Sequence, residues 1–180
     1  MSYAFCYLCG AKTIKEQEEG HPRWRCTQCG QVLFKNAKPA TEIILVTEDN
    51  KAVIVTRARE PYKGKYDLPG GFLELGETLD EALERELLEE VNLKRADYGD
   101  PIYIGNMNVD YPWGKEEHRV LSVRFTARIS SDTPLEPNDD VAKIEFKKLE
   151  ELTPDMFGWS GQYTGVKEAL AYWEKSKPAE

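Results

Sequence analysis

Runs of apolar and β-branched residues predict β-strands in the first half of the chain. Residues 41–47 (TEIILVT) and 52–59 (AVIVTRAR) are separated by the polar tetrapeptide 48–51 (EDNK). Two such runs flanking a short polar turn are typical of a β-hairpin. The next segment, 66–73, contains the sequence Pro-Gly-Gly, and we expect it to form a loop or bulge that leads into a short strand.

A helix is predicted over residues 78–91. Thr78 and Glu81 match the capping-box pattern at its start, and no Gly or Pro interrupts the segment. Asn92 is the expected end of the helix, because Asn is second only to Gly in adopting the left-handed backbone conformation. An apolar stripe along the helix should face the core; it consists of Leu83, Leu87 and Val91.

The second half of the chain carries further strand patterns and a closing helix. Strands are predicted over residues 102–110, 119–129 and 143–149, with a loop over 110–118 (DYPWGKEEH) and an amphipathic helix over 166–175 (VKEALAYWEK). The resulting order, β-β-loop-α-β-β-β-α, predicts an α/β fold in which helices pack on a mixed β-sheet.

Composition and charge narrow the class of protein. The 180 residues, 41% of them hydrophobic, fit one globular domain with a small appendage. The chain starts without a basic and apolar leader, and no apolar run approaches the ~20 residues that cross a bilayer, so we expect a cytoplasmic protein with no membrane partner. The net charge of −8 disfavours a nucleic-acid partner.

Four cysteines near the N-terminus have the spacing of a zinc site. Cys6 and Cys9 are separated by two residues, as are Cys26 and Cys29, and sixteen residues lie between the pairs. Four thiolates complete a tetrahedral shell, so the predicted zinc is structural. The alternative, two disulfides, requires an oxidising compartment. We therefore expect a zinc ribbon over residues 1–36 and a larger domain over 37–180.

The predicted helix 78–91 also concentrates negative charge. Residues 74–90 contain eight acids and one base, which gives a net charge of −7. Glu86, Glu89 and Glu90 fall on one side of the helix, where their repulsion calls for a cation. Mg²⁺ prefers such oxygen ligands, although a solvated acidic face is the plain alternative. Arg85 can pair with Glu81 or Glu89, one turn away.

The same segment resembles the signature of the Nudix hydrolase family. The pattern Gly71-x5-Glu77-x7-Arg85-Glu86-Leu87-x-Glu89-Glu90-x-Asn92-Leu93 matches the Nudix box except at its last glycine, where Asn92 stands. Asn can adopt the same left-handed helix stop, so the change leaves the acidic face intact. The resemblance covers residues 40–150 and implies the family's α/β/α sandwich.

The resemblance also implies catalytic roles. It assigns Mg²⁺ or Mn²⁺ ligation to Glu86, Glu89, Glu90 and the carbonyl of Gly71, with Glu77 and Arg85 as supporting catalytic residues. Water is then the nucleophile that attacks phosphorus, aided by the metal. For the general base we place Glu89 first, and the alternatives from later loops are Glu116, Glu117 and Glu136.

Candidate substrate-binding residues flank the box. Arg57 is the first choice for the phosphates among four nearby basic residues (Arg57, Arg59, Lys63 and Lys65), although such charges also solvate hairpin ends. Gly70 and Gly71 are expected beside the phosphates. Tyr111 and Trp113 can stack on a base or belong to the core.

A four-cysteine ribbon before a Nudix domain is similar to the NADH pyrophosphatase branch of the family. That branch has Ser-Gln-Pro-Trp where this chain has residues 110–113 (DYPW), so NADH, NAD⁺, ADP-ribose, dinucleoside polyphosphates and nucleotide sugars stay open as substrates. The alternative function is a catalytically weak nucleotide-sensing or regulatory module whose ribbon contacts protein or nucleic acid. The ribbon can also serve folding or homodimer formation.

Overall fold

The chain divides into two compact units. A computed structural model describes residues 3–113 and 116–176. The first unit extends to Ala37, and the second comprises Lys38–Trp113 and continues from Glu117. Among the described residues, no helix is long and apolar enough to cross a bilayer.

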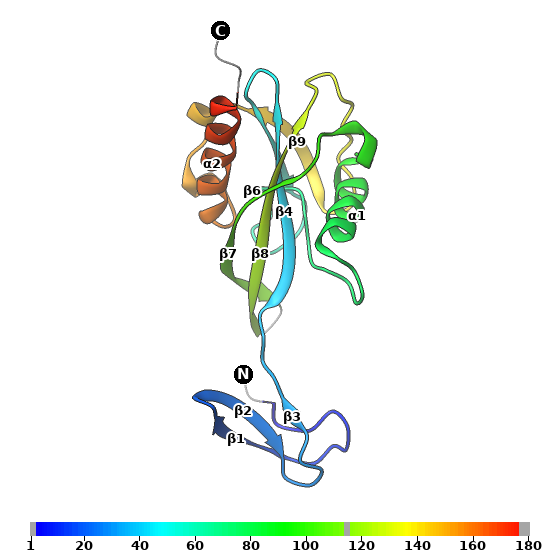
Figure 1. The fold of residues 1–180 in the computed structure, drawn as a ribbon, viewed down its shortest axis with the longest axis vertical. Helices are drawn as coiled ribbons and strands as arrows, with labels where there is room; N and C mark the ends of the chain where they lie inside the picture. The colour runs from blue at the N-terminus through cyan, green and yellow to red at the C-terminus, as the bar shows by residue number, and fades with distance from the viewer. Residues whose placement is uncertain (1–2, 114–115, 177–180) are drawn as a thin grey trace. The chain divides into compact units, whose positions relative to one another are not determined.

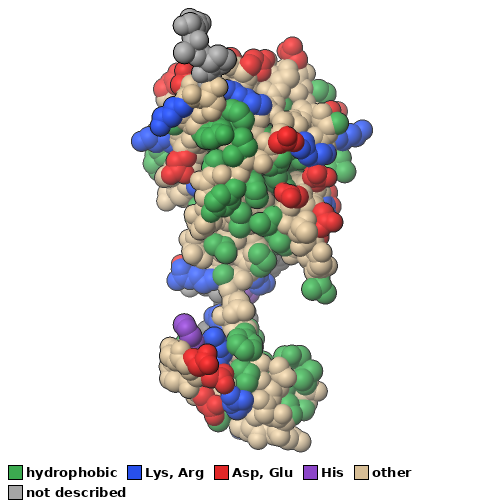
Figure 2. Space-filling view, viewed as in Figure 1, with side chains coloured by type: hydrophobic (Ala, Val, Ile, Leu, Met, Phe, Trp, Pro, Cys, Tyr) green, Lys and Arg blue, Asp and Glu red, His purple; other side chains and the backbone are tan. Residues whose placement is uncertain are grey.

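The first unit is a three-stranded antiparallel sheet with the order β1-β2-β3 (Figure 1). Its strands are β1 (Thr13–Glu18), β2 (His21–Cys26) and β3 (Val32–Leu33). Glu19 and Gly20 both have positive φ, as a tight two-residue turn between β1 and β2 requires. Hydrophobic side chains gather on one side of this unit in Figure 2, and Phe5, Tyr7 and Leu8 are exposed.

The second unit is built on a six-stranded mixed sheet. Its strands run in the order β6-β5-β4-β8-β7, with β9 paired to β5, and β4 is parallel to β8 but antiparallel to β5. The strands are β4 (Lys38–Thr47), β5 (Ala52–Arg57), β6 (Tyr66–Asp67), β7 (Ile102–Trp113), β8 (Glu116–Ile129) and β9 (Val141–Lys147). Short 3-10 helices lie at Arg95–Asp97, Leu149–Glu151 and Pro154–Met156.

Helices cover both faces of this sheet. Figure 1 places α1 (Leu79–Val91) and α2 (Gly161–Lys175) on opposite sides of β4. Ile43 and Leu45 of β4 belong to the core against α1, whereas Ile44 and Val46 belong to the core against α2. Because successive strand residues point to opposite faces, this buried run serves two hydrophobic cores. The α/β/α sandwich is therefore confirmed.

Both ends of the central helix match the prediction. The Thr78 side chain accepts a hydrogen bond from the Glu81 amide, and the Glu81 carboxylate accepts one from the Thr78 amide at 2.8 Å. Asn92 ends the helix with φ 55° and ψ 33°, the left-handed conformation. The predicted hairpin 41–59 and closing helix 166–175 also form, although α2 begins five residues earlier, at Gly161.

The predicted loop over residues 110–118 is corrected by the structure. Strand β7 continues to Trp113 and β8 begins at Glu116, so most of the predicted loop 110–118 is strand. Its polar residues occupy the end of a long strand pair, where hydrophobic content is a poor guide. The side chains of Trp113, Glu116 and Glu117 lie outside the described part of the chain.

Candidate functional site

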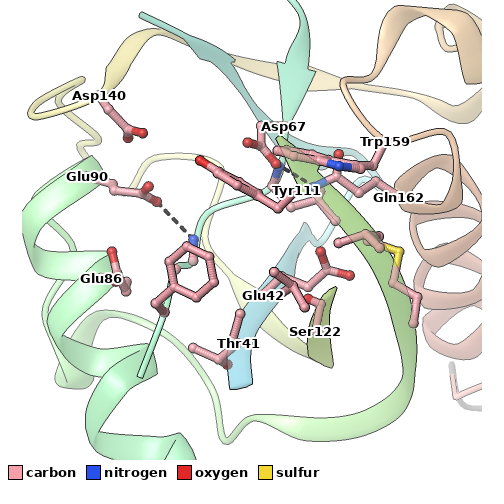
Figure 3. A pocket seen from close by; sticks show the side chains of 18 of the residues that line it. Thr41, Glu42, Asp67, Glu86, Glu90, Tyr111, Ser122, Asp140, Trp159 and Gln162 are labelled. Carbon is pink, nitrogen blue, oxygen red and sulfur yellow. Dashed lines mark hydrogen bonds between the residues drawn. The ribbon is translucent and has the colours of Figure 1, made fainter. Parts of the chain in front are cut away.

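A cavity of about 290 Å³ opens beside the Gly-Gly turn and α1. This volume approaches the lower end of the range for small-molecule sites. Three walls of different chemistry surround it: carboxylates from α1 and the turn before β9, aromatic rings from β7 and the segment before α2, and buried polar groups (Figure 3). Its lining includes Thr41, Glu42, Asp67, Gly70, Gly71, Phe72, Glu86, Glu90, Met107, Tyr111, Ser122, Asp139, Asp140, Trp159 and Gln162.

The Gly-Gly turn lies tightly between β4 and α1. The Gly71 carbonyl accepts a hydrogen bond from the Thr41 amide, and the Gly70 amide donates to the Glu90 carboxylate, both at 2.9 Å. A Cβ on Gly70 would lie 2.2 Å from the Thr41 carbonyl oxygen, and one on Gly71 would lie 2.2 Å from Oε1 of Glu86. Glycine at both positions therefore lets the turn approach the carboxylates.

Arg85 organises the acidic side of the site. Its guanidinium donates to Glu77 at 2.7 Å, to Glu86 at 2.8 Å, to Glu89 at 3.0 Å and to the Phe72 carbonyl at 2.9 Å. The hydrogen bond from Arg85 lowers the pKa of Glu77 to about 2. The predicted pairing of Arg85 with Glu89 is confirmed.

The alternative pairing of Arg85 with Glu81 is wrong. Glu81 instead closes the capping box with Thr78. One turn of separation made either pairing sterically possible, but the helix start captures the Glu81 carboxylate.

The three box glutamates differ in burial. Glu90 is buried, and the loss of solvation raises its pKa well above the usual range. Burial also raises the pKa of Glu86, against the opposing effect of Arg85. The Glu89 side chain is 50% exposed and lies outside the cavity lining. Asp140 lines the same wall, and its charge adds to the repulsion felt by Glu86 and Glu90.

Aromatic side chains form the opposite wall. The ring of Tyr111 stacks on Trp159 with 5.2 Å between centroids and an interplanar angle of 18°. Phe72 meets Tyr111 edge-on at 5.4 Å. The three rings are half-buried and line the cavity, where a planar base can pack against them.

Two buried ion pairs lie behind these rings. Glu42 accepts a hydrogen bond from Nε of Arg124 at 2.7 Å, and Asp67 pairs with Nη1 of Arg57. Burial raises the pKa of Asp67 and of Glu42, and the facing arginine opposes the rise in each case. Gln162, on the first turn of α2, donates from Nε2 to Asp67. The floor of the site is thus a hydrogen-bonded polar layer.

The structure brings together only some of the predicted site residues. Glu86, Glu90, Gly70, Gly71 and Tyr111 line the cavity. Two residues, Arg57 and Glu136, lie differently from expectation. Arg57 is outside the lining, with its guanidinium engaged by Asp67 and by the Pro61 carbonyl at 2.7 Å. Glu136 accepts a hydrogen bond from Asn92, at the far end of α1.

Sequence reasoning missed five residues of the site: Glu42, Asp67, Asp140, Trp159 and Gln162. Glu42 interrupts the apolar run of β4, and a charged residue within a buried strand is a recognisable signal of a paired site. The other four carry no such local signal. Only the tertiary fold brings them to one cavity.

The four cysteines gather within the first unit. Sγ atoms lie 3.7 Å apart for Cys6 and Cys29, 3.4 Å for Cys9 and Cys26, and 3.6 Å for Cys9 and Cys29. Zinc–sulfur bonds of ~2.3 Å at tetrahedral angles place sulfurs about 3.8 Å apart. Backbone hydrogen bonds from Cys29 and Gln28 lower the pKa of Cys26 to about 6. All four thiols are free, so the cluster suits a metal.

Comparisons with known proteins agree with this geometry. A family model for the NUDIX domain matches residues 37–165. NAD-capped RNA hydrolase NudC of Pseudomonas aeruginosa is 29% identical over 151 residues, which cover 83% of this chain and 49% of that protein. The chain therefore spans about half the length of that relative. ADP-ribose pyrophosphatase of Methanocaldococcus jannaschii is 47% identical over 49 residues, 27% of this chain and 29% of that protein.

A solved structure extends the likeness to nearly the whole chain. The crystal structure of a NUDIX hydrolase from Nitrosomonas europaea superposes with a TM-score of 0.71 at 26% identity, over 97% of this chain and 94% of that one. The match to the family covers well over half of the chain and includes the cavity and the whole of α1. The protein belongs to the Nudix hydrolase family.

Proposed function

We propose that this protein hydrolyses the pyrophosphate bond of a nucleoside diphosphate derivative such as NAD(H) or ADP-ribose, with Mg²⁺ or Mn²⁺ as cofactor. One observation carries the proposal: the box carboxylates Glu86 and Glu90 face the stacked rings of Tyr111 and Trp159 across a single cavity. A dinucleotide or nucleotide sugar has the matching parts, a charged pyrophosphate and a planar base.

The donor chemistry of the acidic wall fits a hard divalent cation. Glu86, Glu89 and Glu90 offer carboxylate oxygens, and the Gly71 carbonyl has a second lone pair beside its hydrogen bond to Thr41. A cation would stabilise the ionised form of the buried Glu90, which burial alone disfavours. Among the described residues, no three carboxylates lie as close together as the four thiols do. Glu86 and Glu89 are paired with Arg85, and they would leave it to bind the cation. When bound, the cation neutralises phosphate charge and acidifies water.

The protein's own groups position the substrate and receive the proton. The half-buried rings of Tyr111 and Phe72, which line the cavity, hold the base, and the glycine turn lets the pyrophosphate approach α1. A carboxylate then takes the proton of the attacking water. Glu89 keeps its place as first candidate because it shares Arg85 with Glu86, although it lies outside the cavity lining. Asp140 joins it because it lines the cavity, whereas Glu136 bonds to Asn92 instead.

Two relatives guide the choice of substrates. One is named a hydrolase of NAD-capped RNA and the other an ADP-ribose pyrophosphatase. The panel for this chain is therefore NADH, NAD⁺, ADP-ribose, diadenosine polyphosphates, nucleotide sugars and a short NAD-capped RNA, each with Mg²⁺ or Mn²⁺. Release of AMP or another nucleoside monophosphate is the expected result.

A matched pair of variants separates catalysis from nucleotide sensing. Glu89→Gln should lower kcat by ~10²–10⁴-fold while nucleotide binding persists, as for loss of a general base. Glu84→Gln, on an exposed position of the same helix, should leave kcat unchanged. Equal turnover of Glu89→Gln and wild type would remove Glu89 from the mechanism. Nucleotide binding without turnover of any substrate would favour a sensing module.

We further propose that residues 1–36 form a zinc ribbon and residues 37–180 the catalytic domain. The sulfur–sulfur separations of 3.4–3.7 Å support a single ion between Cys6, Cys9, Cys26 and Cys29. With four protein ligands, the ion has no open position for substrate, so its role is structural.

A further inference from the structure

Gln162 lines the cavity and holds a buried acceptor that has no partner among the described residues. Its side chain is 3% exposed, and its Oε1 has no hydrogen-bond partner among the described residues. A buried carbonyl oxygen without a donor destabilises the protein, so such an atom beside a binding cavity marks a place for a ligand group. Figure 3 shows Gln162 beneath Trp159, away from Glu86 and Glu90.

The orientation of the Gln162 amide follows from its neighbour. Its Nε2 donates to Oδ1 of Asp67, whose other oxygen pairs with Arg57. A flipped amide would turn Oε1 toward a carboxylate, placing two acceptors together. The ion pair of Asp67 therefore holds Oε1 as the free end of the amide.

The hydroxyl groups in the described lining, those of Thr41, Tyr111 and Ser122, make no hydrogen bond to Oε1 of Gln162. The described lining of the cavity contains no Lys or Arg, while Glu42 and Asp67 add further acceptors. Arg124 lies behind Glu42. Its Nε donates to Glu42, and its Nη2 donates to the Met107 sulfur and the Gly161 carbonyl. The end of the cavity around Gln162 is thus rich in acceptors, and a ligand must bring the N–H.

We propose that Gln162 is a specificity residue that selects substrates whose ring carries an amino or carboxamide NH₂ group, and rejects analogues with oxygen at that position. The inference rests on the proposed function and deepens it. A substrate ring packed beside Tyr111 and Trp159 would direct its NH₂ group toward Oε1 of Gln162. Adenine and nicotinamide both supply this chemistry. Hypoxanthine and nicotinic acid carry an oxygen at that position instead. This oxygen would face the acceptor oxygens of Gln162 and Glu42, with which it cannot form a hydrogen bond.

Two substrate pairs test the proposal and identify the ring. ADP-ribose against its hypoxanthine analogue reports on adenine, and NAD⁺ against nicotinic acid adenine dinucleotide reports on nicotinamide. In the wild type, at least one pair should differ in kcat/KM by roughly 5- to 150-fold in favour of the NH₂ form, as for one unmatched buried hydrogen bond. Equal kcat/KM within both pairs overturns the proposal without any variant.

A variant locates the selection in the amide. Gln162→Leu should reduce the preferred ratio to about threefold or less, mainly by losing the NH₂ substrate, while Gln17→Leu on exposed β1 should retain it. An undiminished ratio in folded Gln162→Leu would exclude Gln162 as the selecting residue. If no substrate is turned over, the proposed function fails. The dissociation constants of the same four nucleotides, measured by calorimetry, then decide the inference separately.

Discussion

Replacing Gly71 by alanine should lower activity by orders of magnitude while sparing the fold. The added Cβ would lie 2.2 Å from Oε1, 2.5 Å from Cδ and 2.8 Å from Oε2 of Glu86. All three atoms belong to the end of a flexible side chain, so Glu86 can swing away. The backbone of Gly71 is not in the positive-φ region, and stability should therefore stay within about 1 kcal/mol of the wild type.

The neighbouring glycine provides the matched control. Gly70 has φ +140°, and its added Cβ would meet Thr41 and Glu42 backbone atoms at 2.2–2.9 Å. Backbone strain of ~1–3 kcal/mol and overpacking of ~1–3 kcal/mol together predict about 2–6 kcal/mol of destabilisation in Gly70→Ala. For a chain of this length, that lowers Tm by roughly 5–20 °C.

Two measurements on the same samples separate the effects. Gly71→Ala should melt within a few degrees of wild type, yet lose ~10²–10³-fold in kcat/KM, as for removal of one transition-state contact. It should also need more Mg²⁺ for half-maximal turnover, since Glu86 is displaced. Full activity in Gly71→Ala, or a fall in Tm equal to that of Gly70→Ala, would refute this account of the turn.

Three further predictions concern the helix ends and the cysteines. Asn92→Ala should cost about 1 kcal/mol because alanine lacks a favourable left-handed conformation, and thermal unfolding compared with Asn92→Gly measures it. The hydrogen bond from the Thr78 amide holds the pKa of Glu81 below its ordinary 4.5. The ionised Glu81 therefore stabilises the fold fully above pH 4.5, and this stabilisation is lost as the pH falls below that value. The urea midpoints of unfolding at pH 6 and pH 3.5 should accordingly differ less in Glu81→Gln than in the wild type. Metal analysis should find one zinc per chain. Chelation of the zinc should remove the protection of backbone amides against hydrogen exchange in β1 to β3 but not in α1. A metal-free protein in which these strands remain protected would contradict the zinc ribbon.

The parts that the sequence predicts best are those governed by neighbouring residues. The start and stop of α1 follow from Thr78, Glu81 and Asn92, which act within a single turn of helix. The hairpin of β4 and β5 follows from two β-branched runs and a polar turn. In these cases, local hydrogen bonds and side-chain shape agree with the final packing.

The parts that the sequence does not predict depend on distant partners. Gln162 meets Asp67 across 95 positions of the chain, and Glu42 meets Arg124 across 82. Nothing near Gln162 in sequence distinguishes it from a surface residue at the start of an amphipathic helix. Arg57 shows the opposite case, in which a local signal is misleading. Its position just before the box predicted a contact with phosphate, whereas tertiary packing pairs its guanidinium with Asp67.

The acidity of the Nudix box is distributed over several structural tasks. Glu81 caps α1, Glu77 holds Arg85, and Glu90 accepts the Gly70 amide that places the glycine turn. These contacts stabilise the negative charges of the segment, which would otherwise repel one another. Glu86 and Glu89 share Arg85 as their cation and would exchange it for a divalent metal, whereas Glu90 would serve both the glycine turn and the metal. The number of acids in the helix therefore overstates the metal ligands, and the partners of each acid distinguish those that build the site from those available to bind within it.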